Sequence, residues 1–142
     1  AAAVLVMSAE KAKALGLKPR ARIVAQAIVG SEPTIMLTGP IPATAKVLKK
    51  AGLQIKDIDL FEVNEAFAPV VLAWQHETGA DMEKGNYSGG AIAVGHPLGA
   101  SGARLLTTML HAPERQDARY GLSTMCIVHC IGTAPINQLL KN

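Results

Sequence analysis

The chain has 142 residues, of which 49% are hydrophobic and 18% are charged, and its formal net charge is +3. This length is typical of one domain, and the hydrophobic share is large enough to build a core. The basic residues are scattered and are not interleaved with aromatic ones, which argues against a nucleic-acid-binding protein. The sequence shows no signal peptide and no run of about 18 apolar residues, so it predicts no membrane span.

The predicted elements alternate between strands and helices. The chain opens in a buried strand over residues 2–7, as if cut from something longer, and Ser8 then caps a helix over residues 10–15 that ends at Gly16. A strand over residues 22–30 and a loop over 31–38 come next. A helix over 43–51 follows Pro40 and Pro42 and closes at Gly52. The chain continues with a strand within 57–63, a helix over 66–78 stopped by Gly79, and a loop over 80–88.

The remaining elements complete a layered α/β pattern. They are a helix over residues 98–111 that ends before Pro113, a strand over 121–128 and a last strand over 133–139. Pro135 places this last strand at an edge of the sheet, because proline cannot donate to a ladder. The alternation predicts a single α/β domain over residues 1–142.

The two cysteines, Cys126 and Cys130, are too few for a disulfide framework. On a straight strand, four residues separate two Cα atoms by about 13 Å, whereas a disulfide needs less than about 7 Å. The sequence therefore favours free thiols in a reducing compartment, and we expect a cytoplasmic protein.

The most specific motif covers residues 88–104, Ser-Gly-Gly-Ala-Ile-Ala-Val-Gly-His-Pro-Leu-Gly-Ala-Ser-Gly-Ala-Arg. It places His96 at a glycine turn before a helix, where unpaired amides and the helix field favour negative charge on an oxygen. The turn lacks the Lys-Ser/Thr pair of a P-loop and the three-glycine spacing of a dinucleotide site. The segment resembles the active-site histidine segment of thiolases, the acetyl-CoA acetyltransferase family.

A second motif covers residues 57–68, Asp-Ile-Asp-Leu-Phe-Glu-Val-Asn-Glu-Ala-Phe-Ala. From the residues alone, Asn64 is a candidate N-cap, and Glu65 supports the start of the following helix. The segment resembles the thiolase segment with the Asn-Glu-Ala-Phe motif. The resemblance implies that Asn64 holds a water, which forms an oxyanion hole with His96 for the thioester carbonyl.

A third motif covers residues 119–126, Arg-Tyr-Gly-Leu-Ser-Thr-Met-Cys. It resembles the strand that delivers the second catalytic cysteine of thiolases, which implies that Cys126 is a general acid/base at the acetyl α-carbon. Cys130 competes for this role because it begins a Cys-Ile-Gly tripeptide, but it stands four residues late, so we favour Cys126. The family usually has a glycine cluster after this cysteine, where the present chain has Ile127, Val128, His129 and Cys130.

The resemblance covers nearly the whole chain and corresponds to the C-terminal half of a thiolase, nearest to acetyl-CoA acetyltransferases. Residues 1–20 resemble the end of the N-terminal half and the crossover, and residues 38–43 resemble the Gly-Pro-x-Pro-Ala start of a family helix. The implied fold is a thiolase-like layered α/β domain, with a mixed sheet of about five strands covered by helices.

The implied activity is acyl transfer between 3-ketoacyl-CoA or acetyl-CoA and CoA, by thiolysis or Claisen condensation. The resemblance gives catalytic roles to Cys126, His96 and Asn64; it gives substrate-binding roles to Gly95, Gly99 and Phe67. The nucleophilic cysteine belongs to a thiolase N-terminal half, supplied in cis or in trans, so we expect the isolated chain to be inactive. We expect an oligomer that takes a coenzyme A thioester as substrate and needs no other cofactor.

Three alternatives compete with this hypothesis. The chain could be a non-catalytic remnant that binds an acyl-CoA or a protein. It could be a cysteine–histidine hydrolase that uses Cys126 and His96, which ranks last because no nucleophile elbow surrounds the cysteine. A metal site could use His96, His111, Cys126, His129 and Cys130, but their spacing fits no usual zinc pattern, so we expect none.

Overall fold

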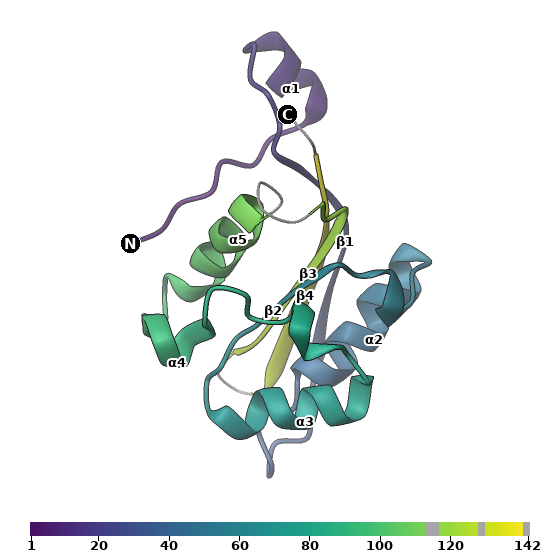
Figure 1. The fold of residues 1–142 in the computed structure, drawn as a ribbon, viewed down its shortest axis with the longest axis vertical. Helices are drawn as coiled ribbons and strands as arrows, with labels where there is room; N and C mark the ends of the chain where they lie inside the picture. Colours follow the sequence, from purple (N-terminus) through teal and green to yellow (C-terminus); the bar gives the residue numbers. More distant parts are fainter. Residues whose placement is uncertain (113–116, 128–129, 141–142) are drawn as a thin grey trace.

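The computed structural model describes residues 1–112, 117–127 and 130–140 and has a four-stranded sheet at its centre (Figure 1). The strands are β1 (Ala21–Gly30), β2 (Leu60–Val63), β3 (Tyr120–Ile127) and β4 (Ile131–Leu139), in the order β1–β4–β3–β2. β4 is antiparallel to β1 and β3, whereas β2 is parallel to β3. The mixed sheet confirms the predicted fold class, with four strands in the described ranges rather than about five.

Helices lie on both faces of the sheet (Figure 1). They are α1 (Ala9–Ala14), α2 (Pro40–Ala51), α3 (Ala68–Thr78), α4 (Gly90–Val94) and α5 (Ser101–His111), with 3-10 turns at Ile55–Asp57 and Met82–Lys84. α2 packs on β1 and β4 and is joined by α3, while α5 packs on β2 and β3. No helix in the described part of the chain is long and apolar enough to cross a membrane.

Local signals in the sequence place the helix ends correctly. The Ser8 hydroxyl accepts a hydrogen bond from the Lys11 amide at 3.2 Å and starts α1. α2 and α3 end at Gly52 and Gly79, which both have a φ of 67°. α2 begins at Pro40, three residues earlier than predicted, because proline suits the first helical position. Pro113 and Val128 lie outside the described residues.

The larger part of the core lies between the sheet and the α2–α3 layer. Trp74 on α3 is fully buried; its indole nitrogen donates to the Thr44 hydroxyl on α2 at 2.8 Å. Its ring meets the Phe61 ring of β2 edge-on, with 5.3 Å between centroids. One side chain therefore ties two helices to a strand. A smaller apolar cluster around Met109 anchors α5 on the other face.

The predicted buried strand over residues 2–7 is wrong. The segment has no regular secondary structure and contains no buried residue; Leu5 is 76% exposed and Val6 is 65% exposed. An apolar, β-prone sequence becomes a strand only where a neighbour offers ladder groups. No described strand lies beside this segment.

The predicted edge position of the last strand is also wrong, since β4 lies between β1 and β3. Pro135 is tolerated there because the β3–β4 ladder is interrupted next to it, between the pairs formed by Leu122 and Met125. The Thr124 hydroxyl donates to the Thr133 carbonyl at 2.8 Å within this gap. A side-chain bond therefore joins β3 and β4 at the end of the interrupted stretch.

Two glycines allow α2 to approach β4 closely. A Cβ added to Gly132 would lie 2.1 Å from the Gly39 carbonyl oxygen, and one added to Gly39 would lie 2.6 Å from the Gly132 nitrogen. Both obstacles are backbone atoms that cannot rotate away. The start of α2 is therefore fixed against β4 by the absence of two side chains.

Replacing Cys130 by glycine (C130G) is expected to stabilise the chain by up to about 1 kcal/mol. Cys130 has a φ of 64°, a left-handed conformation that costs an L-residue about 1–2 kcal/mol. Part of this gain is offset because glycine also gains freedom in the unfolded chain. Urea unfolding measures the change. The C130A variant keeps the strain and controls for the lost thiol, so equal stability of C130G and C130A would contradict the explanation.

Candidate active site

Asn64 and His96, 32 positions apart in the chain, meet at one end of the sheet. The Asn64 backbone amide donates to the Thr124 carbonyl at 2.9 Å, which ties the residue after β2 to β3. The Asn64 side chain is fully buried, and its Nδ2 donates to His96 Nε2 at 3.5 Å. Its Oδ1 is buried without a hydrogen-bond partner in the described structure, so it is free to accept a bond from a water or a ligand.

Ser101, the first residue of α5, orients the His96 ring. His96 Nδ1 lies 2.6 Å from the Ser101 hydroxyl oxygen, and this hydroxyl donates to the Pro97 carbonyl at 3.1 Å. Because the single hydroxyl proton goes to Pro97, we assign the ring proton to Nδ1. Nε2 is then unprotonated, so it can accept a proton at the end that faces Asn64.

Two predicted structural roles are wrong. Asn64 does not cap α3, whose N-cap residue is Phe67. The Glu65 carboxylate supports α4 instead of α3: its oxygens accept from the Ile92 amide at 2.6 Å and from the Asn86 side chain at 3.2 Å. Sequence separation hides this contact, because the N-terminus of α4 lies more than twenty residues downstream. The carboxylate holds the backbone that leads to His96.

Cys126 lies on β3, near the same end of the sheet as Asn64. β2 and β3 run parallel, with Val63 opposite Thr124, so the residues that follow them emerge together. The thiol is half-buried, and burial raises its pKa above the ordinary value of 9.0. Within the described ranges, no hydrogen bond joins the thiol to the His96 ring.

Cys130 lies in a different environment. Its thiol faces the Pro33 carbonyl at 3.8 Å, and its own carbonyl accepts from the Ser31 amide at 2.7 Å. These contacts place Cys130 beside the loop after β1, whereas Asn64 follows β2 at the opposite end of the strand order. The choice of Cys126 over Cys130 remains a prediction that this arrangement favours.

The candidate substrate-binding positions are open. Phe67 is 64% exposed. A Cβ at Gly95 or Gly99 would have no heavy atom within 4 Å, although the φ of 89° at Gly95 itself favours glycine. Their roles stay predictions. Of the candidate metal ligands, His129 lies outside the described residues, and among the described residues no group of three or more His, Cys, Asp or Glu gathers.

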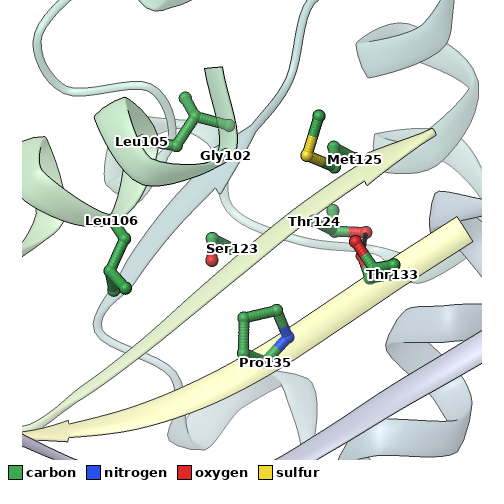
Figure 2. Close-up of a pocket in the computed structure, with 8 residues that line it drawn as sticks. All are labelled: Gly102, Leu105, Leu106, Ser123, Thr124, Met125, Thr133 and Pro135. Carbon is green, nitrogen blue, oxygen red and sulfur yellow. Dashed lines mark hydrogen bonds between the residues drawn. The ribbon is translucent and has the colours of Figure 1, made fainter. Parts of the chain in front are cut away.

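Two cavities of about 220 Å³ flank α5, and the sequence patterns indicated neither of them. One is mostly apolar and lies between α5 and the β3–β4 ladder (Figure 2). Its lining residues are Gly102, Leu105 and Leu106 from α5, Ser123, Thr124 and Met125 from β3, and Thr133 and Pro135 from β4. The other lies between α5, β2 and α4, and Glu62 is one of its lining residues.

Glu62 is 4% exposed, and burial raises its pKa to about 7 from an ordinary value of 4.5. The nearby Glu65 carboxylate adds to the increase, whereas the Arg104 charge opposes it. Glu62 therefore holds a proton in the folded chain at pH values where the unfolded chain has released it.

Unfolding stability is expected to fall as the pH rises between about 4.5 and about 7. The stability that protonated Glu62 contributes is fully present below its unfolded pKa, and it is lost as the pH approaches the folded pKa of about 7. The E62Q variant cannot ionise, so its decline over this window should be smaller. Urea unfolding at several pH values measures the effect, and E77Q, at an exposed position on α3, is the matched control.

Comparison with known proteins shows the family. Residues 17–138 match the family model described as the thiolase C-terminal domain. The 3-ketoacyl-CoA thiolase of Citrobacter koseri is 58% identical over 100% of this chain and 37% of that protein. The acetyl-CoA acetyltransferase of Syntrophomonas wolfei is 54% identical over 99% of this chain and 36% of that protein. The chain therefore spans little more than a third of the length of these curated relatives.

Solved structures agree with this assignment. The crystal structure of human mitochondrial 3-ketoacyl-CoA thiolase matches with a TM-score of 0.91 at 45% identity, and that of Bacillus anthracis acetyl-CoA acetyltransferase with 0.90 at 42%. Each match covers 94% of this chain and 34% of the other. The identities to 3-ketoacyl-CoA thiolases and to acetyl-CoA acetyltransferases are similar. The prediction that the chain is nearest to acetyl-CoA acetyltransferases is therefore not confirmed. The chain belongs to the thiolase family and corresponds to its C-terminal domain.

Proposed function

We propose that this chain is the C-terminal catalytic half of a thiolase, which transfers an acyl group between 3-ketoacyl-CoA or acetyl-CoA and CoA. The observation that carries the proposal is the Asn64–His96 pair, with Nε2 of His96 left as a base and Oδ1 of Asn64 left as an acceptor. Relatives named for these reactions support it. Coenzyme A thioesters are the proposed substrates, with no further cofactor.

In the proposed cycle, His96 Nε2 takes the proton of a nucleophilic cysteine that an N-terminal half supplies. The protonated Nε2 then donates to the thioester oxygen of the substrate, together with a water held by Asn64. Both groups stabilise the negative charge that develops on this oxygen as the bond between the α-carbon and the keto carbon breaks. Because Nδ1 stays bonded to Ser101, the ring keeps its orientation while its charge changes.

Cys126 is the proposed general acid/base at the α-carbon. Burial raises the pKa of its thiol, so at neutral pH the group holds a proton that it can return to the departing acetyl unit in thiolysis. Condensation requires the reverse transfer, in which Cys126 acts as a thiolate. A substrate or partner half that changed the local charge would adjust this pKa.

An exposed apolar surface supports the need for a partner half. The face of β1 that points away from α2 carries Val24 at 36% and Ile28 at 64% exposure, and Ile127 at the end of β3 and Ile131 at the start of β4 are 43% and 36% exposed. Adjacent apolar groups of this size normally contact another protein surface. An oligomer that includes the N-terminal half would cover them.

Reassembly tests the proposal. The purified chain is mixed with the N-terminal half of a related thiolase, and the cleavage of a 3-ketoacyl-CoA is followed by its loss of absorbance. We expect turnover from the mixture and none from either part alone. An N-terminal half without its nucleophilic cysteine is the negative control. A complex that forms and binds acyl-CoA without turnover would contradict the proposal and favour the non-catalytic alternative.

A further inference from the structure

Arg104 links α5 to the backbone that carries His96. Its Nη1 donates to the Val94 carbonyl at 3.1 Å and also makes a short hydrogen bond to the Gly95 carbonyl. Gly95 directly precedes His96, while Ser101, one turn before Arg104 on α5, holds the imidazole ring. α5 therefore fixes His96 twice, at the ring and at the preceding backbone.

Arg104 and Glu62 both line the cavity between α5, β2 and α4. The Arg104 Nη2 is buried and has no hydrogen-bond partner among the described residues. Glu62 lines the same cavity and is 4% exposed, and no hydrogen bond or ion pair is found for its carboxylate in the described part of the chain. When Glu62 is ionised, it and Arg104 attract each other without a hydrogen bond or ion pair between them, since Coulomb interactions reach further where little water screens them.

We propose that Arg104 is a positioning residue for His96 and that Glu62, in its ionised form, is the counter-charge that keeps Arg104 in place. Glu62 lies on β2 two residues before Asn64, so the pair connects the strand that presents Asn64 with the turn that presents His96. A planar guanidinium holds its donors in a fixed direction, which the flexible ammonium of lysine does not reproduce. The inference rests on the proposed function for the role of His96, but it concerns the geometry of this chain alone.

The state of the His96 ring is the direct readout. The chain is labelled with 15N at histidine, and the ring signals are recorded at a basic pH, where the imidazole is neutral and Glu62 is ionised. The wild-type chain should show widely separated signals, with the proton on Nδ1. In R104M the two signals should move toward each other, because the ring no longer stays on Ser101 in all molecules. R104K should give an intermediate separation, and E62Q a smaller change in the same direction.

Two controls distinguish positioning from general support of the fold. The R22M variant removes an exposed arginine that bonds Gln138 at 2.6 Å, and the exposed His76 ring serves as an internal reference. The R22M variant should leave the His96 signals unchanged, and the His76 signals should be the same in all the variants. Unchanged His96 signals in R104M, with lower resistance to urea, would overturn the inference. If the separation of the His96 ring signals decreases in R104M but does not change in E62Q, the role of Glu62 is overturned.

Turnover separates this inference from the proposed function. In the reassembled enzyme, R104M should lower kcat with little change in KM, because the substrate still binds while His96 is misplaced. Absence of turnover in the wild-type mixture would contradict the proposed function. The ring signals of the isolated chain would then still decide whether Arg104 positions His96.

Discussion

Thiolysis by the reassembled enzyme is expected to fall by about 10²–10⁴-fold when His96 is replaced by alanine (H96A), the usual cost of losing a positioned acid/base group. The substitution removes both the base and the donor that the proposed cycle assigns to Nε2. KM should change much less than kcat, since the ring acts mainly as charge develops on the thioester oxygen. Steady-state kinetics with a 3-ketoacyl-CoA measures both parameters.

H76A is the matched control for this change. His76 is exposed in the last turn of α3 and is not one of the candidate site residues, so its loss should leave kcat unchanged. A loss in H96A no larger than the loss in H76A would remove His96 from the mechanism. Such a result would leave the hydrogen bond to Asn64 as a structural contact only.

Replacing Trp74 by alanine (W74A) is expected to destabilise the chain by about 3–5 kcal/mol, the usual range for removing a buried aromatic side chain. The indole is fully buried between α2, α3 and β2, so alanine leaves a cavity and ends the ring contact with Phe61. Urea unfolding followed by circular dichroism measures the loss. Fluorescence cannot serve, because Trp74 is the only tryptophan.

The W74F variant separates volume from hydrogen bonding. It keeps most of the buried area but loses the indole N–H that donates to Thr44, which should cost about 1 kcal/mol. The Thr44 hydroxyl still donates to the Pro40 carbonyl at 2.8 Å and therefore keeps one partner. Equal losses in W74A and W74F would show that the hydrogen bond, and not packing, dominates at this position.

The features that the sequence predicted well depend on neighbouring residues. Ser8, Gly52 and Gly79 end or begin helices where expected, because capping involves only the adjacent turn. The features that it missed depend on distant partners. Pro135 lies in a central strand because β3 leaves a gap beside it, and the apolar residues 2–7 form no strand because no described strand pairs with them.

The same distinction applies to the candidate site. Resemblance to thiolases selected Asn64 and His96, and the structure brings them within 3.5 Å. Ser101 and Arg104 lie within the motif over residues 88–104, but the motif did not predict their roles, because these depend on contacts with the His96 ring and with the Val94 and Gly95 carbonyls. Supporting residues of this kind become visible only when the fold shows which backbone they meet.

The strand order has a consequence for synthesis of the chain. β4 joins β1 to β3, and Ala21 of β1 pairs with Leu139 of β4, 118 positions later (139 − 21). During translation, β1 and the part of α2 that packs on β4 therefore stay uncovered until β4 has left the ribosome. Ladders that close such long loops form slowly, and the waiting surfaces are prone to aggregation. A ribosome stalled before residue 131 should thus present a nascent chain that recruits chaperones and is readily cut by proteases.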